Sequence, residues 1–176
     1  MTTDGFPELA LPQLVRLAEP VIAAAARSGR TIATVESLTG GLLGAALTGV
    51  SGASAVYRGG LITYATDLKA SLAGVDADEL ARFGAVSAQT ARGMAVGAAA
   101  RCGAEVGIAL TGVAGPDPQE GHPAGTVFCG WYAPAGGAAH RELRLSGDRA
   151  AIRYAAVAAA LGVLGGLLDP DASGAE

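Results

Sequence analysis

The sequence contains few of the residue types that build metal centres and disulfide frameworks. Its 176 residues include two cysteines, two histidines and, among twelve basic residues, a single lysine, Lys69. Cys102 and Cys129 lie in apolar surroundings without metal-ligand spacing, so we interpret them as small buried hydrophobic residues in a reducing compartment. No His/Cys/Asp cluster, Walker A sequence, G-x-S-x-G elbow or dinucleotide fingerprint is present. We therefore expect neither a metal nor a cofactor.

Basic surfaces and long apolar runs are also scarce. The formal net charge of -4 and the pI of about 5.1 argue against a nucleic-acid partner. The opening residues, MTTDGFPE, have no basic n-region, so no signal peptide is expected. The longest uncharged run, Tyr154 to Leu168, is shorter than the roughly 20 residues of a membrane span. These features predict a soluble cytoplasmic protein without a membrane partner.

The composition that remains is typical of a small α/β domain. Hydrophobic residues make up 51% of the chain, and there are 27 glycines. The length fits a single domain over 1–176, with a core at about 10–168 and a disordered tail at 169–176. Helical and strand patterns alternate, which predicts a three-layer α/β/α fold whose mixed, mainly parallel sheet carries helices on both faces.

The chain order predicts where each element lies. Helices are expected at 11–28, 41–48, 66–74, 76–83, 87–102 and 148–167, with N-caps at Thr66, Asp76 and Asp148. Strands are expected at 31–35, 55–65, 105–110, 125–133 and 140–145, the last two forming a hairpin. Gly59-Gly60 indicates a bulge or a close backbone approach in the second strand.

The turn at Glu36–Gly41 is the most informative local feature. It follows a buried strand and precedes a helix, so its backbone N–H groups and the helix dipole favour an anion. Ligands of open α/β sheets bind beyond the carboxyl ends of the strands. We therefore expect the polar turns after Val35, after the second strand and after Leu110 to converge on a site for a small anion.

The side chains that can perform chemistry at such a site are hydroxyls and an amine. Arginine supplies the other eleven basic residues, and only a lysine can readily lose its proton, so Lys69 is either a tuned base or a chance survivor on a solvated helix. A serine could give its proton to a neutral lysine beside a tyrosine. Each candidate also has a structural interpretation as a cap, a packing residue or a solvated charge. From these residues alone, no specific reaction follows.

Seven motifs, in order, resemble the CinA C-terminal domain family over roughly residues 10–165. They are VESLTGG at 35–41, GAS at 52–54, GGLITYATDLKASLAGV at 59–75, FGAVSAQTARGMAVGA at 83–98, ALTGVAGP at 109–116, GTV at 125–127 and SGDR at 146–149. The resemblance implies a homodimeric amidase of pyridine-nucleotide salvage. Such an enzyme converts nicotinamide mononucleotide and water into nicotinic acid mononucleotide and ammonia.

The resemblance also implies roles for individual residues. It maps the catalytic group onto Ser54 as nucleophile with Tyr64 and Lys69, and it makes Ser37 a wall of the pocket instead of the attacking group. The implied substrate-binding residues are Ser37, Thr39, Gly40, Gly41, Thr111, Gly112 and Arg149, with Arg149 and the backbone of Gly40, Gly41 or Gly112 contacting phosphate.

The sequence departs from the family pattern at four places. Leu38 replaces a cysteine, and Ala65-Thr66 replaces a Ser-Asn pair between the retained Tyr64 and Lys69. Asp117-Pro118 replaces a glycine-rich loop, and His122 replaces a lysine with a side chain only partly charged at neutral pH. The alternatives are a non-catalytic nucleotide-binding module with a regulatory or damage-related role, and a serine-lysine amidase with another substrate.

Overall fold

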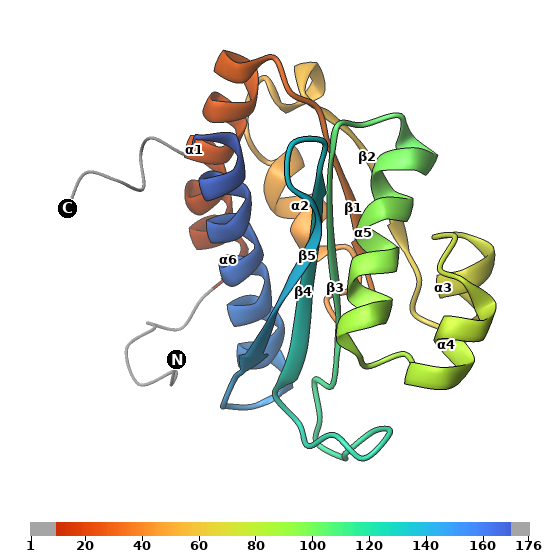
Figure 1. Ribbon diagram of the computed structural model, residues 1–176. Coiled ribbons are helices and arrows are strands. Elements are labelled where there is room, and N and C mark those ends of the chain that lie inside the picture. Colours follow the sequence, from red (N-terminus) through yellow and green to blue (C-terminus); the bar gives the residue numbers. More distant parts are fainter. Residues whose placement is uncertain (1–9, 170–176) are drawn as a thin grey trace.

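The computed structural model describes residues 10–169, which form one mixed five-stranded sheet with helices packed against it (Figure 1). The strand order is β2-β1-β3-β4-β5. The strands are β1 (Ile32–Glu36), β2 (Tyr57–Ile62), β3 (Val106–Gly112), β4 (Thr126–Ala133) and β5 (Gly137–Arg144).

The sheet is half parallel, which corrects the prediction of a mainly parallel one. β1 pairs in parallel with β2 and β3, whereas β4 runs antiparallel to both β3 and β5. The segment 113–125 between β3 and β4 contains no helix, and a parallel return usually requires a helical crossover. The chain therefore reverses directly into β4.

Helices cover the two faces of this sheet. They are α1 (Leu11–Ser28), α2 (Leu42–Thr48), α3 (Thr66–Ser71), α4 (Ala77–Phe83), α5 (Ala88–Cys102) and α6 (Arg149–Leu168), with a 3-10 turn at Ala53–Ala55. Figure 1 shows α1 and α6 side by side on one face and α5 on the other, with α3 and α4 beyond it. The expectation of a loose N-terminus and a disordered tail falls outside the described residues, except at Ala10 and Asp169.

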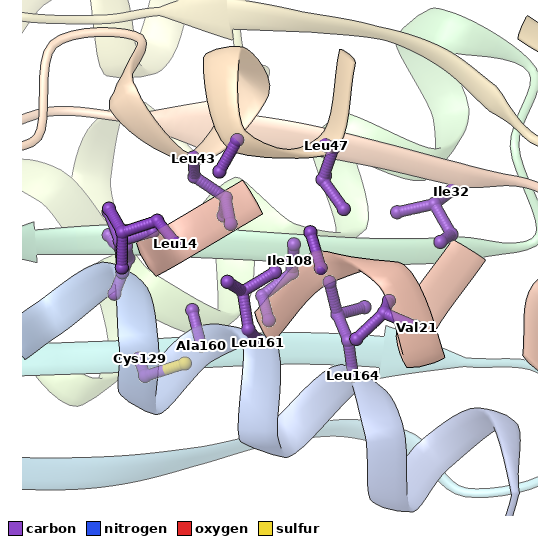
Figure 2. Packing of buried hydrophobic residues seen from close by; sticks show 14 of the residues in the cluster. Leu14, Val21, Ile32, Leu43, Leu47, Ile108, Cys129, Ala160, Leu161 and Leu164 are labelled. Carbon is purple, nitrogen blue, oxygen red and sulfur yellow. The ribbon is translucent and has the colours of Figure 1, made fainter. Parts of the chain in front are cut away.

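The larger core lies between α1, α2, α6 and the sheet (Figure 2). Leu14 and Val21 of α1 meet Leu161 and Leu164 of α6 over Ile108 of β3, and all of these side chains are at most 2% exposed. The apolar spacing that predicts helix 11–28 includes Leu14 and Val21, which are buried here, and Leu17, which is 43% exposed. Pro20 lies inside α1, which continues through it to Ser28 and ends at Gly29 in the left-handed conformation, as expected.

The second core, under α5, is made of small residues that bring backbones close together. A Cβ atom on Gly97 would approach the Ala73 carbonyl oxygen closer than 3.0 Å, a separation that real Cβ atoms essentially never show. Gly107 of β3 lies equally close to the backbone of α5 at Ala95. The abundance of Ala and Gly in these segments therefore reflects direct backbone packing of α5 on its neighbours.

Most predicted helix caps are confirmed. Asp76 accepts hydrogen bonds from the amides of Asp78 and Glu79, and Asp148 accepts one from Ala151 at 2.8 Å. The Thr66 cap is wrong, because Thr66 is the first residue of α3 and the N-cap position belongs to Ala65. The glycine-rich part of β2 does contain a register shift, between the partners of Ile32 and Ala33.

Helix α6 is long and apolar enough to cross a membrane by length and composition, unlike the run estimated from the sequence. Among the described residues it alone meets that test, with a mean hydropathy of 1.8. However, Ile152, Val157, Leu161 and Leu164 are buried against α1 and the sheet. We therefore interpret α6 as a core helix of this fold.

Candidate active site

The polar turns that follow β1, β2 and β3 meet at one cavity of about 340 Å³. This volume is within the range of small-molecule sites, roughly 300–1,000 Å³. Six of the predicted site residues line it: Ser37, Tyr64, Lys69, Thr111, Gly112 and Arg149. The segment 113–119 completes the wall. The expected convergence of strand ends is therefore confirmed.

Lys69 is the central polar group of the cavity. Its side chain comes from α3, is 2% exposed, and donates from Nζ to Ser37 Oγ at 3.0 Å and to the carbonyl of Thr63 at 2.9 Å. Burial lowers the pKa of Lys69 below that of a free lysine, and the charges of Glu120 and Asp67 oppose this only partly. A neutral Lys69 amine could accept the Ser37 proton across the same contact.

The turn that carries Ser37 is anchored by the protein's own anion. The carboxylate of Glu36, 2% exposed, accepts hydrogen bonds from the amides of Gly41 at 3.1 Å, Leu43 at 3.0 Å and Gly44 at 2.8 Å. This carboxylate therefore occupies the N-terminus of α2. The expectation that the helix end attracts an anionic ligand is corrected: the anion there is Glu36.

Three residues predicted to bind substrate do not reach the cavity. Gly40 donates its amide to Ser37 O at 3.1 Å, and the Gly41 amide is held by Glu36, so neither amide is free for a phosphate. Thr39 is fully buried, and its hydroxyl has no hydrogen-bond partner among residues 10–169. These hydrogen bonds therefore do not support the predicted phosphate role of the Gly40-Gly41 backbone.

Tyr64 and Arg149 form a pair at the cavity rim. Arg149 donates to the Tyr64 hydroxyl at 2.9 Å and to the carbonyl of Gly115 at 2.8 Å. Tyr64 is 62% exposed, and among the described residues its hydroxyl bonds to Arg149 and not to Lys69. This geometry presents a held guanidinium, a suitable group for a phosphate or carboxylate.

Thr111 and Gly112 line the cavity and contact the backbone around it. The Thr111 hydroxyl donates to the carbonyl of Ala85 at 2.6 Å, and because a hydroxyl has one hydrogen, it cannot also donate to an oxyanion. Gly112 has φ 156°, and a Cβ there would lie 2.5 Å from the carbonyl oxygen of Thr126. The Thr111 hydroxyl is therefore committed to the protein backbone.

Ser54, the predicted nucleophile, lies at the other end of β2. Ser54 is an exposed residue of the 3-10 turn before β2, whereas Lys69 contacts Thr63, just after β2. A strand rises about 3.3 Å per residue, so the six residues of β2 separate the two ends by roughly 17 Å or more. In this arrangement Ser54 cannot pass a proton directly to Lys69, and the hydroxyl that contacts Lys69 Nζ is that of Ser37.

Two charged residues near the site were not identified from the sequence. Arg153 of α6 donates to the carbonyls of Leu38 at 3.1 Å and Thr39 at 2.8 Å. Glu120 accepts from the Val86 amide at 3.0 Å and helps to hold the cavity wall. The only sequence signal for Arg153 was its spacing of four residues from Arg149, one helical turn along the same face.

Together, these features define an α/β domain whose cavity holds a buried lysine against a serine, with a clamped arginine at the rim. A family model described as the CinA C-terminal domain matches residues 14–168. The chain belongs to the CinA C-terminal domain family. A CinA-like protein of Frankia casuarinae is 54% identical over 131 residues, which are 74% of this chain and 30% of that protein.

Solved structures agree with this assignment. A CinA superfamily protein from Klebsiella pneumoniae is 35% identical, with a TM-score of 0.85, and the match covers 89% of this chain and 98% of that one. The competence/damage inducible protein CihA from Agrobacterium tumefaciens is 40% identical, with a TM-score of 0.81 and coverage of 86% and 93%. The chain spans less than a third of the length of the curated relatives that it matches.

Proposed function

We propose that this protein is an amidohydrolase that deamidates nicotinamide mononucleotide to nicotinic acid mononucleotide and ammonia. The observation that carries the proposal is the 3.0 Å contact between the buried Lys69 Nζ and Ser37 Oγ in a cavity of suitable size. Membership of a family that includes such amidases supports the choice of substrate. We also propose a cytoplasmic homodimer acting in pyridine-nucleotide salvage.

Ser37 acts as the nucleophile and Lys69 as the proton carrier. Ser37 Oγ bonds to the carboxamide carbon while its proton moves to the neutral Lys69 amine. The carbon–nitrogen bond then breaks, and Lys69 returns the proton to the departing ammonia. A water attacks the resulting ester and gives a proton to Lys69, which passes it to Ser37 Oγ as the ester bond breaks. The products are a carboxylic acid and regenerated Ser37.

The rest of the cavity supports this reaction. Arg149, held by Tyr64 and Gly115, is the proposed phosphate contact. The Leu38 amide follows the nucleophile directly, as does one oxyanion donor of many serine hydrolases. Leu38 lines the cavity, and its N–H has no acceptor among the described residues. It is therefore the proposed oxyanion donor.

The test is ammonia release from nicotinamide mononucleotide by the wild type and three variants. Ser37→Ala should abolish turnover, and Lys69→Arg should lose most of the roughly 10²–10⁴-fold that acid–base catalysis contributes. Ser54→Ala should match the wild type, because Ser54 lies beyond the far end of β2. Wild-type activity retained by Ser37→Ala and lost by Ser54→Ala would overturn the assignment. Nucleotide binding without turnover would favour the non-catalytic module, and ammonia release only from other amides would favour a different substrate.

A further inference from the structure

Among residues 10–169, Arg153 is the cation whose hydrogen bonds go to the backbone of the Ser37 turn. Its Nε donates to the carbonyl of Leu38 at 3.1 Å, and its Nη2 donates to that of Thr39 at 2.8 Å. Arg153 is half-buried and does not line the cavity. It is thus placed behind the turn, where it holds the backbone without reaching the substrate space.

The backbone amides of the turn are almost all committed. Ser37 donates its amide to Leu110 O at 2.9 Å, and the amides of Gly40 and Gly41 are used inside the turn. Within residues 37–44, only the amides of Leu38 and Thr39 have no acceptor among the described residues. Leu38 and Thr39 are 4% and 0% exposed, so these free donors are withdrawn from bulk solvent. A buried amide without an acceptor destabilises the fold, so these two donors need an acceptor, which a bound substrate can supply.

Arg153 controls the direction of the Leu38 amide through two planar peptide groups. In a trans peptide the C=O and N–H bonds point in opposite directions, so fixing one fixes the other. Arg153 holds the oxygen of the Thr39–Gly40 peptide, and the N–H of that peptide donates to Ser37 O at 3.1 Å. Ser37 O belongs to the peptide whose N–H is the free Leu38 amide. The guanidinium therefore sets the orientation of this donor without touching it.

We infer that Arg153 is a positioning residue for the oxyanion-binding amide of Leu38. The inference rests on the proposed function, since it requires Ser37 to be the nucleophile. The second hydrogen bond of Arg153, to Leu38 O, restrains the Leu38–Thr39 peptide in the same way and so orients the Thr39 amide. The fixed positive charge beside both carbonyls also favours negative charge developing at the turn.

The experiment compares Arg153→Met, Arg153→Lys and Arg30→Met in steady-state turnover of nicotinamide mononucleotide. Arg30 is the matched control, because it also donates to a backbone carbonyl, that of Leu167 at 3.1 Å, away from the cavity. Loss of one oxyanion donor costs roughly 10²–10³ in kcat. Arg153→Met should approach that loss with KM little changed. The kcat of Arg153→Lys, whose ammonium is a point charge and not a planar fork of donors, should lie between the kcat of Arg153→Met and that of the wild type.

A second assay separates this inference from the choice of substrate. The burst of nitrophenolate from p-nitrophenyl acetate reports acylation of Ser37, and it should slow in Arg153→Met and disappear in Ser37→Ala. If the wild type ignores the mononucleotide but shows this pattern, the proposed function fails while the inference stands. Thermal unfolding identifies any variant that does not fold. If Arg153→Met does not fold, the turnover and burst rate of Arg153→Lys are compared with those of the wild type instead.

Three outcomes overturn the inference. Unchanged kcat and unchanged burst rate in a folded Arg153→Met would remove the positioning role while leaving Ser37 as the nucleophile. A rise in KM at constant kcat would instead assign the guanidinium to substrate binding. A kcat loss in Arg30→Met equal to that in Arg153→Met would reduce the effect to general stability.

Discussion

Substitution of Gly97 should disturb both stability and catalysis, because α5 packs there on the segment that carries Lys69. A Cβ at Gly97 would lie 2.7 Å from the Ala73 carbonyl carbon and closer still to its oxygen. Ordinary contact begins at 3.4 Å, so Gly97→Ala must push the two backbones apart. Ala73 donates its amide to the carbonyl of Leu68, beside Lys69, and Val75 donates to the carbonyl of Lys69 itself at 3.0 Å. The displacement is therefore transmitted to the backbone of Lys69.

The size of the effect follows from two opposing terms. Overpacking costs about 1–3 kcal/mol, and a backbone-to-backbone clash belongs at the upper end. Alanine gains about 1 kcal/mol over glycine inside a helix. The net loss for Gly97→Ala is about 2 kcal/mol, which lowers Tm by about 4–8 °C for a domain of this size.

Gly162 of α6 provides the control for this prediction. A Cβ there meets nothing within 4 Å, so Gly162→Ala should gain up to about 1 kcal/mol from helix propensity. Differential scanning calorimetry and ammonia release on both variants measure the two effects. A Gly97→Ala protein with wild-type Tm and wild-type turnover would refute the close-packing argument and its link to Lys69.

Three further outcomes are expected. Since burial lowers the pKa of Lys69 from 10.5, the unfolded chain binds more protons than the folded one between the folded pKa and 10.5, and the free energy of unfolding should rise with pH in that window. Lys69→Met should flatten this slope in urea titrations. The kcat/KM of the wild type should rise with pH with an apparent pKa below 10.5. Glu36→Ala leaves the buried Leu43 amide without its acceptor and should lower the free energy of urea unfolding by about 1–3 kcal/mol. The loss should be smaller in Glu36→Gln, which keeps one carbonyl oxygen. Equal stability of the wild type and both variants would contradict this prediction. Burial raises the pKa of Cys129 to about 12, so iodoacetamide at neutral pH should alkylate the half-buried Cys102 and leave Cys129 unmodified until the chain is unfolded. Mass spectrometry of tryptic peptides measures the labelling, and equal labelling of both cysteines in the folded state would contradict this prediction.

The sequence by itself determined the features whose causes are local. Caps such as Asp76 and Asp148 bind amides two or three residues away, so their residue types predict the helix starts. The helix expected at 11–28 matches α1, which ends at Gly29 in the left-handed conformation that glycine readily adopts. The single lysine was recognised as unusual from composition alone. Polar turns after three strands also placed the cavity at the correct end of the sheet.

Only the tertiary structure decided which groups meet at that end. Ser37 and Lys69 are 32 positions apart, and Arg153 reaches Leu38 across 115, so no spacing rule connects them. Ser54 carries a hydroxyl like Ser37, but it precedes β2, whereas Lys69 contacts the residue that follows β2. The Glu36–Gly41 turn predicted an anion at a helix end, and folding supplies that anion from Glu36 itself. A nucleophile requires a partner within hydrogen-bond distance, and that distance is set by packing between elements remote in the chain.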